Sequence, residues 1–533
     1  MGKYVFGIDL GTTYSCIAYV DDTGRPTVIP NKEGDATTPS VVNFASSDSV
    51  VVGQIAKEVA EIDPQNTISL VKTLMGKSKF AINYNGEDWS PEQVSAEILK
   101  KLTRDAAEAL NTEVRDVVIT CPAYFGTTEA EATRVAGEIA GLNVIEIMRE
   151  PTAAALYYGV TKATEEKTFL VYDLGGGTFD VTVMKVSVDG NIEVVCMDGD
   201  HDLGGKDWDV QLMNYLAAQF CEVTGFDGDF DEYGQQTLRL KAETAKKQLT
   251  QRPEVPVMLD AEGLRARINV TQDIFDEITE SLLEQTIEKT DAVLNVAKSK
   301  NCEIDEIFMV GGSTKMPQVS RILQERYGVP ISVLDPDQAV AKGAALYAVV
   351  AYSNQKSNQE EEPESELAVR PEHIPTIGGG TIKDIKIEMA ATKSYGLDVF
   401  RNGNELLCNN IIIKNAKMTN GEVTVTKEYG THIDNQTEVE FNIYESDFMD
   451  EWYEIDDDYL IGTATLPLPG NLPADSPLQV TFSLNTEGIL KLRGVDLVTK
   501  KEVNAEFVAT NGISMTKEEI KKAKEKSKGI VVE

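Results

Sequence analysis

The chain has 533 residues, 42% of them hydrophobic and 26% charged, which is enough for several compact domains with apolar cores. A net charge of -37 repels phosphates and anionic lipids, and so excludes nucleic acid and membranes as expected partners. The 6 cysteines are scattered without a C-x-x-C pair, and the N-terminus shows no secretion signal, which together predict a cytoplasmic protein with reduced thiols.

The first part of the chain alternates short β-branched runs with amphipathic helical patterns. A helix is expected over residues 92–110, where Ser90 and Gln93 fit a capping box. A second helix begins after Thr271 and places its apolar residues on one face. This alternation predicts an α/β domain over residues 1–352.

The composition changes abruptly after this domain. Residues 353–392 are acidic and then Gly-rich, and we interpret them as an interdomain linker. Apolar residues alternate with polar ones at Ile385, Ile387 and Met389, so this part of the linker can dock as an edge strand. Residues 393–512 alternate apolar and polar side chains between turn dipeptides, which predicts a small antiparallel β domain. Residues 513–533 are expected to form one charged helix, whose capping box runs from Thr516 to Glu519.

One short motif occurs twice, as G-I-D-L-G-T-T-Y at residues 7–14 and as Y-D-L-G-G-G-T-F-D at residues 172–180. In each copy an Asp ends a strand before a turn of Gly and Thr, whose backbone N–H groups and hydroxyls can approach an anionic oxygen. A single copy is more often just a tight turn. The duplication favours two hairpins that clamp one polyphosphate, and the chain has neither a P-loop nor a dinucleotide motif opening a helix.

Two further groups of residues suit a nucleotide. The glycines of V-G-G-S-T allow the backbone to lie against a flat ring or a ribose. Four polar residues share one face of a predicted helix and can grip sugar hydroxyls: Glu243, Lys246, Lys247 and Thr250. Taken alone, this face would be a solvated Glu/Lys pair, and Lys72 would be a solvated helix lysine.

Seven motifs occur in a fixed order: G-I-D-L-G-T-T-Y-S, C-P-A-Y-F, E-P-T-A-A-A, Y-D-L-G-G-G-T-F-D, L-G-G-K-D, V-G-G-S-T and D-P-D-Q-A-V-A-K-G-A-A. In this combination the chain closely resembles the seventy-kilodalton heat-shock chaperones of the DnaK type. The resemblance is strong over residues 1–352 and weaker from residue 393 to about residue 520. The linker departs from the family, and most of the family's helical lid is expected to be missing.

The resemblance implies an α/β actin-like, two-lobed ATPase domain followed by an all-β sandwich that binds peptides. It implies an ATP-dependent molecular chaperone that acts in protein folding and the stress response. Such a protein binds extended apolar segments of unfolded polypeptides and releases them on ATP binding, with slow ATP hydrolysis as the switch. ATP or ADP would bind with Mg²⁺, and a nucleotide-exchange factor is a further candidate partner.

The motifs also imply the residues of each site. The catalytic residues would be Lys72, Glu150, Asp173, Thr178, Asp180 and Asp9, with Asp9 and Asp173 holding Mg²⁺ through water. The nucleotide would be bound by Gly11, Thr12, Thr13, Tyr14, Gly175, Gly176, Gly177, Gly205, Glu243, Lys246, Lys247, Thr250, Gly311, Gly312, Ser313, Lys315 and Asp337. The peptide-lining positions would be Leu397, Val399, Phe400, Tyr429, Val439 and Phe441, which without the resemblance would be assigned to the sandwich core.

Several positions depart from the family pattern. Lys247 and Lys315 replace the usual arginines, which puts the stacking of a flat guanidinium on adenine in doubt. Glu146 stands where the family carries the arginine that pairs with J-domain co-chaperones, so an ordinary J-domain is expected to leave hydrolysis nearly unchanged. Two other functions remain open. One is an actin-superfamily kinase for a small molecule, which has no need of the β domain, and the other is an ATP-switched binder of one dedicated client protein.

Overall fold

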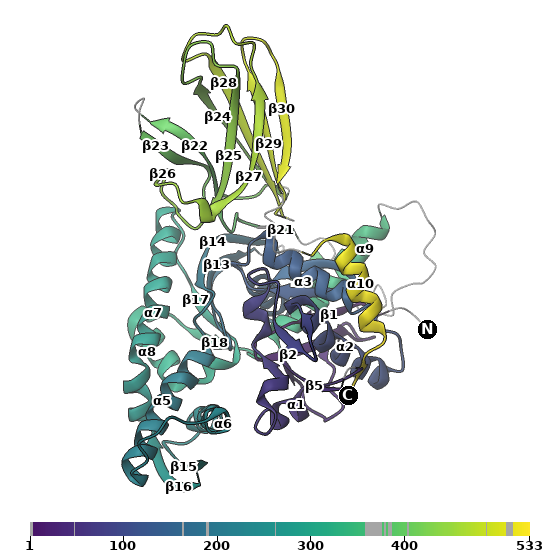
Figure 1. Ribbon diagram of the computed structural model, residues 1–533, viewed down its shortest axis with the longest axis vertical. Helices are drawn as coiled ribbons and strands as arrows, with labels where there is room; N and C mark the ends of the chain where they lie inside the picture. Colours follow the sequence, from purple (N-terminus) through teal and green to yellow (C-terminus); the bar gives the residue numbers. More distant parts are fainter. Residues whose placement is uncertain are drawn as a thin grey trace.

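The computed structural model describes residues 4–46, 48–162, 165–187, 191–261, 263–357, 376–377, 380–381, 386–401, 405–419, 421–486, 488–507 and 515–533. It shows a large α/β body with a β sandwich at one end (Figure 1). All six cysteines lie in the described segments and are free thiols. Among the described helices, none combines the length and the apolar character needed to cross a membrane.

The first sheet of the body is built around the first copy of the repeated motif. Its strand order is β11-β10-β1-β2-β3, and a further short strand, β4, pairs with β2. β1 runs parallel to β10 and antiparallel to β2, so the motif forms a hairpin beside a parallel strand. The bounds are β1 (Phe6–Asp9), β2 (Tyr14–Val20), β3 (Pro26–Val28), β4 (Thr38–Pro39), β10 (Asp116–Cys121) and β11 (Asn143–Arg149).

The second sheet repeats this arrangement around the second copy of the motif. Its order is β18-β17-β12-β13-β14-β21, in which β12 is antiparallel to β13 and parallel to β17. The sequence repeat therefore has a counterpart in sheet topology. The bounds are β12 (Lys167–Leu174), β13 (Phe179–Val186), β14 (Ile192–Asp200), β17 (Glu306–Val310), β18 (Ile331–Val333) and β21 (Ile387–Glu388).

The edge strand β21 comes from the segment that the sequence assigned to the linker. Ile387 and Glu388 pair with β14 in parallel, as the apolar alternation predicted, whereas Ile385 lies outside the described residues.

Two helices that are rich in small residues, α4 (Glu150–Lys162) and α9 (Ala339–Ser357), join one buried cluster with both sheets. A Cβ added to Gly343 on α9 would lie 1.7 Å from the Ala153 carbonyl oxygen on α4, so the helices touch backbone to backbone. A Cβ at Gly7 on β1 would likewise lie 2.1 Å from the Ala345 nitrogen. Close packing thus accounts for the small residues of the E-P-T-A-A-A and A-K-G-A-A motifs. α9 extends beyond residue 352, the expected end of the first domain, to Ser357.

The remaining helices of the body cover the sheets and form their outer parts. The Ser90–Gln93 capping box at the start of α2 is confirmed by both of its hydrogen bonds, and Thr271 caps α7 by accepting from the Ile274 N–H. The bounds are α1 (Gln54–Val59), α2 (Pro91–Leu110), α3 (Thr127–Ile139), α5 (Gly205–Thr224), α6 (Glu232–Leu249), α7 (Gln272–Ser299) and α8 (Pro317–Tyr327).

Smaller sheets complete the body. The pairs β15–β16 and β8–β9 are hairpins, and β31-β6-β5-β7 is a four-stranded sheet. The bounds are β5 (Val41–Ser46), β6 (Ser49–Val52), β7 (Thr67–Ser69), β8 (Ile82–Tyr84), β9 (Glu87–Trp89), β15 (Glu254–Ala261), β16 (Leu264–Thr271), β19 (Thr376–Ile377), β20 (Gly380–Thr381) and β31 (Val531–Val532).

The predicted antiparallel β domain is a sandwich of two sheets, β26-β23-β22-β25-β27 and β24-β28-β29-β30, which share one apolar core. On β25, Phe441 and Ile443 face this core while Glu440 is exposed, as the alternation predicted. The bounds are β22 (Ser394–Arg401), β23 (Glu405–Ile412), β24 (Glu422–Gly430), β25 (Glu438–Ser446), β26 (Trp452–Tyr453), β27 (Leu460–Pro467), β28 (Pro477–Asn485), β29 (Leu490–Asp496) and β30 (Glu502–Phe507).

The helix predicted near the end of the sequence is α10 (Lys517–Lys528), and its capping box from Thr516 to Glu519 is present. Its location was not expected. It lies against α2 and α3 of the body rather than over the sandwich, and β31 follows it into the sheet of β6 (Figure 1).

Candidate functional site

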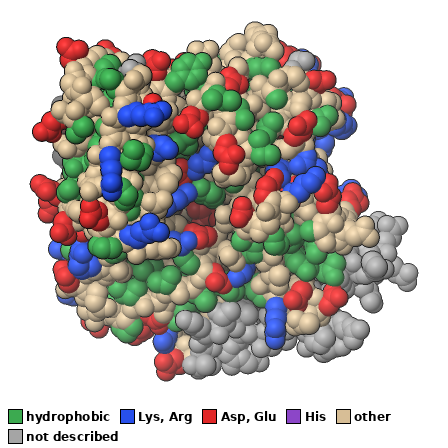
Figure 2. Space-filling view, turned by 90° about the horizontal axis from the view of Figure 1, so that it is seen from below, with side chains coloured by type: hydrophobic (Ala, Val, Ile, Leu, Met, Phe, Trp, Pro, Cys, Tyr) green, Lys and Arg blue, Asp and Glu red, His purple; other side chains and the backbone are tan. Residues whose placement is uncertain are grey.

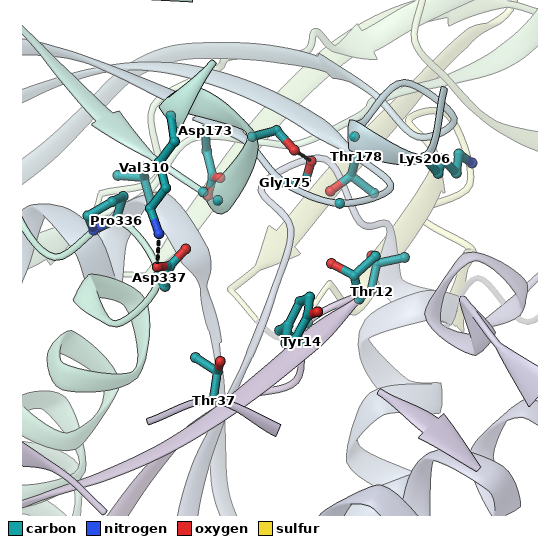
Figure 3. Close-up of a pocket in the computed structure, with 18 of the residues that line it drawn as sticks. Thr12, Tyr14, Thr37, Asp173, Gly175, Thr178, Lys206, Val310, Pro336 and Asp337 are labelled. Atoms are coloured by element: carbon teal, nitrogen blue, oxygen red, sulfur yellow. Dashed lines mark hydrogen bonds and ion pairs between the residues drawn. The ribbon is translucent and has the colours of Figure 1, made fainter. Parts of the chain in front are cut away.

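A pocket of about 410 Å³ lies between the turns of the two repeated hairpins. Figure 3 shows Thr12 and Tyr14 from the first hairpin facing Asp173, Gly175 and Thr178 from the second. Seen from the end that carries α1 and α6, the molecule is hollowed near the centre of this face, with basic and acidic side chains around the hollow (Figure 2). The repeated motif therefore builds one concave, charged site.

The two turns approach each other so closely that glycine is required. A Cβ at Gly176 would lie 2.1 Å from the Thr13 Oγ1 atom, and a Cβ at Gly177 would lie 2.5 Å from the Thr12 Cγ2 atom. Any side chain there would push the two sheets apart. The glycines thus set the width of the pocket.

One buried ion pair lies at the floor of the pocket. The Lys72 Nζ atom is 2.6 Å from the Glu150 Oε1 atom, and both side chains are buried. Lys72 sits in a short 3₁₀ turn after β7, and Glu150 is the first residue of α4. Burial alone would lower the pKa of Lys72, but the charges of Glu150 and Asp9 and the hydrogen bond to Glu150 together outweigh it, and the pKa is raised. Lys72 therefore stays charged, and it is not the solvated helix lysine that its sequence context suggested.

Three aspartates surround this pair. Asp9 ends β1 and accepts a hydrogen bond from the Thr120 hydroxyl at 3.2 Å, and Asp180 on β13 accepts from the Ala123 N–H at 3.1 Å. Burial, and next the charge of Glu150, raise the pKa of Asp9 to about 7. The same two causes raise the pKa values of Asp173 and Asp180 well above the ordinary range. Four carboxyl groups thus face one ammonium, and further positive charge would be stabilised here.

The donor set suits a hard divalent cation such as Mg²⁺, which prefers carboxylate and water oxygens. Asp9 and Asp173 point toward the same pocket from the two sheets. Within the described part of the chain, no three His, Cys, Asp or Glu side chains gather closely enough to hold a metal by themselves. A cation between Asp9 and Asp173 would therefore need water or ligand oxygens to complete its shell.

Charged side chains on α6 form one wall of the pocket. Glu243 lies 2.6 Å from the Lys57 Nζ atom and 2.7 Å from that of Lys247, and both lysines donate to the Tyr14 hydroxyl. Burial alone would raise the pKa of Glu243, but the charges of Lys57 and then Lys247 lower it to about 2. The Glu/Lys face is therefore a bridge between α1 and α6 rather than a solvated pair.

The opposite wall comes from the V-G-G-S-T loop after β17. Gly311 has a φ of 83°, and a Cβ there would lie 2.4 Å from the Leu174 carbonyl oxygen. The Ser313 hydroxyl donates to the Gly175 carbonyl at 2.8 Å, which ties the loop to the second hairpin. Lys315 pairs with Asp337 at the rim. This wall presents backbone where a flat ring could lie.

Nearly all residues proposed for catalysis or nucleotide binding line this pocket, and the exceptions are Gly177 and Asp180. Several lining residues had not been expected from the sequence: Thr37, Lys206, Asp209, Gln251, Pro336 and Val340. Asp209 forms an ion pair with Lys246 at 2.8 Å. The motif L-G-G-K-D points to Gly205, but Asp209 lies one helical turn further and carries no signal of its own.

The six positions expected to line a peptide groove are divided between the core and the surface. Leu397 and Phe441 are buried in the sandwich core. Partly buried positions that pack against this core are Val399, Tyr429 and Val439. Phe400 is 46% exposed, and its ring stacks on His432 with centroids 4.0 Å apart.

The sandwich contacts the body directly. The Asn415 side chain accepts from the Met197 N–H at 2.9 Å and donates to the Met197 carbonyl at 3.2 Å. Lys414 forms an ion pair with Asp198 at 2.8 Å. These contacts fall on β14, next to β21.

Comparison with known proteins places the chain in one family. The family model described as Hsp70 protein matches residues 5–81 and 77–361. A protein named chaperone protein DnaK from Thermotoga neapolitana is 36% identical over 536 residues, which cover 99% of this chain and 83% of the relative. The protein of the same name from Thermosipho africanus is 36% identical over 537 residues, with the same coverage. The chain therefore belongs to the Hsp70 family.

Proposed function

We propose that the pocket between the repeated hairpins binds and hydrolyses ATP, and that the β sandwich holds extended apolar segments of unfolded polypeptides. Family membership makes the chain an ATP-dependent chaperone and an ATPase, with an actin-like ATPase domain and a β-sandwich substrate domain. Our assignment of these domains is residues 1–352 and 393–512, joined by a linker over 353–392 and followed by a helical segment over 513–533. The two six-stranded sheets would be the cores of the two lobes.

The observation that carries this proposal is the buried Lys72–Glu150 pair at the floor of a pocket built from two Gly/Thr turns. The turns offer N–H groups and the hydroxyls of Thr12, Thr13 and Thr178 to phosphate oxygens. Hydrolysis of a phosphoanhydride needs positioning and charge stabilisation more than a strong base. The buried Lys72–Glu150 pair would supply the positioning and the charge.

Each group at the floor would have a distinct task. Lys72 would hold the attacked phosphate and Glu150 would orient the attacking water, with Thr178 beside them and Asp180 assisting. Asp9 and Asp173 would hold Mg²⁺ through water. When bound, Mg²⁺ neutralises phosphate charge during transfer.

The nucleoside would lie between α6 and the V-G-G-S-T loop. One side is formed by Glu243, Lys246, Lys247 and Thr250, and the other by Gly311, Gly312, Ser313, Lys315 and Asp337. The lysines are already engaged, since Lys247 pairs with Glu243 and Lys315 with Asp337. They would therefore bind the nucleoside edge by hydrogen bonds and charge rather than by stacking.

For the sandwich we propose that Phe400 is the principal exposed contact with a bound peptide. Val399, Tyr429 and Val439 would shape the groove with their exposed parts, while Leu397 and Phe441 would support it from the core. Extended peptides bind such surfaces by backbone hydrogen bonds together with side-chain pockets.

One experiment tests the whole assignment. The protein is mixed with Mg-ATP and an extended apolar peptide, and phosphate release and peptide release are followed together. We expect the peptide to raise the hydrolysis rate and ATP to release the peptide. Phosphate appearing on an added sugar instead of in solution would indicate a kinase, and a response to one client only would indicate a dedicated binder.

A further inference from the structure

Residues 515–533, here called the C-terminal anchor, pack on the nucleotide-binding domain. Ala523 on α10 is buried in one apolar cluster with Ala96 on α2 and with Val135 and Ile139 on α3. Figure 1 shows α10 lying alongside these helices, away from the sandwich. The small Ala96 and Ala523 side chains allow the two helices to come close.

A buried polar contact fixes the end of this helix. The Ser527 hydroxyl donates to the Glu97 carboxylate at 2.8 Å, and Glu97 is 0% exposed on its side chain. Lys100 pairs with the same carboxylate at 3.1 Å and also donates to the Ser527 carbonyl. Burial raises the pKa of Glu97, so the charged carboxylate depends on these partners. Removing the anchor would take away one of the hydrogen bonds of a buried carboxylate.

The strand that follows completes a sheet. β31 runs parallel to β6, with the Val531 N–H donating to the Asp48 carbonyl and the Glu533 N–H to the Val50 carbonyl, both at 2.8 Å. The Val52 N–H donates back to Glu533 at 3.0 Å. Without β31, β6 would be an edge strand that pairs with β5 alone.

The two valines of β31 have opposite environments. Val532 is 7% exposed and belongs to the apolar core of the N-terminal lobe, whereas Val531 is 58% exposed. The strand therefore inserts one side chain into a core that otherwise comes from the first part of the chain. This is the packing of an integral strand rather than of a loosely attached tail.

We propose that the C-terminal anchor is a permanent part of the nucleotide-binding domain and stays docked with either ATP or ADP bound. The sandwich is then tied to the body at both ends, through β21 on β14 and through the anchor. The sequence between Phe507 and Met515 can extend over at most roughly 30 Å. The sandwich can therefore move away from the body only as far as this segment allows, and α10 does not cover a bound peptide.

Hydrogen exchange on the full-length protein tests this directly, because it needs nucleotide binding but no hydrolysis. The amides of Val52, Val531 and Glu533 are expected to be equally protected with ATP and with ADP. Val532→Asp should raise their exchange at least tenfold, whereas Val531→Asp, on the exposed side of the same strand, should change it less than twofold. Faster exchange of the anchor in ADP than in ATP would overturn the proposal, as would an unaffected exchange rate in Val532→Asp.

A cross-link provides the second test. Ser49 and Val531 are direct partners in the β6–β31 register, so Ser49→Cys with Val531→Cys places two thiols at disulfide distance. We expect the oxidised protein to hydrolyse ATP and release peptide within twofold of its reduced form. A loss that reductant restores would show that the anchor must leave during the cycle. This readout rests on the proposed function, and absent hydrolysis in the parent protein would refute that function without touching the anchor.

Discussion

Lys72→Ala removes the ammonium that pairs with Glu150 at the floor of the pocket. Glu150 would remain buried next to Asp9, Asp173 and Asp180 without its partner at 2.6 Å. Removing one member of a buried ion pair costs about 3–5 kcal/mol of stability. Loss of one positioned charge in the transition state costs about 3–4 kcal/mol, which corresponds to a rate reduced by roughly 10²–10³-fold. The variant should therefore be less stable and nearly inactive.

Two measurements separate these effects. Single-turnover hydrolysis with pre-bound ATP reports the chemical step, and calorimetric ADP binding, expected to change little, reports the pocket. Lys72→Met with Glu150→Gln removes both charges while keeping most of the volume, so it should regain stability without regaining hydrolysis. Full single-turnover activity of Lys72→Ala would refute the assignment of the site.

The remaining predictions concern the acid cluster, the J-domain contact and the sandwich. The pKa of Asp9 in the folded protein, about 7, lies above its ordinary 3.8, so the folded state binds more protons than the unfolded state does. Asp9 alone should therefore lower the free energy of unfolding by up to about 4 kcal/mol as pH rises from about 4 to 7, and denaturation curves of Asp9→Asn should differ from those of the parent protein by this share of the fall. Glu146 accepts a hydrogen bond from the Tyr347 hydroxyl at 2.9 Å. Its charge should repel the acidic contact residue of a J-domain by about 1 kcal/mol, so an ordinary J-domain should leave single-turnover hydrolysis nearly unstimulated. Glu146→Arg should restore part of the stimulation. A large stimulation of the unmodified protein would contradict this. Phe400→Asp should weaken binding of a fluorescent apolar peptide by at least tenfold, whereas Val498→Asp, similarly exposed but outside the proposed groove, should not; equal effects would remove Phe400 from the site.

Local signals in the sequence predicted much of the fold and of the candidate site. The capping boxes at Ser90 and Thr516 depend on residues three positions apart, and both helices begin where expected. The repeated D-L-G motif predicted two facing hairpins, because its Asp, Gly and Thr residues act together within one turn. Such patterns can be recognised in the sequence because the interacting residues are close together in the chain.

Contacts between distant residues could not be predicted in this way. Lys57 and Glu243 are 186 positions apart, and nothing in the sequence near Lys57 distinguishes it from a solvated helix lysine. Arg149 is three positions after Glu146 and by its place in the sequence could serve the J-domain contact, but its guanidinium donates to the Cys121 sulfur and the Pro122 carbonyl. The location of α10 on α2 likewise depends on packing that no local pattern encodes.

The anchor also sets the order in which the protein can finish folding. Ser527 and Glu97 are 430 positions apart, so the apolar core around the first sheet is complete only after almost all of the described chain has been made. Once α9 has been synthesised to Ser357, this core must wait roughly 10 to 35 seconds, at ordinary rates of translation, for Val532 to emerge. During that interval the edge of β6 and the Glu97 carboxylate lie open to water. During its own synthesis this protein therefore exposes a strand edge until the residues of β31 have been made.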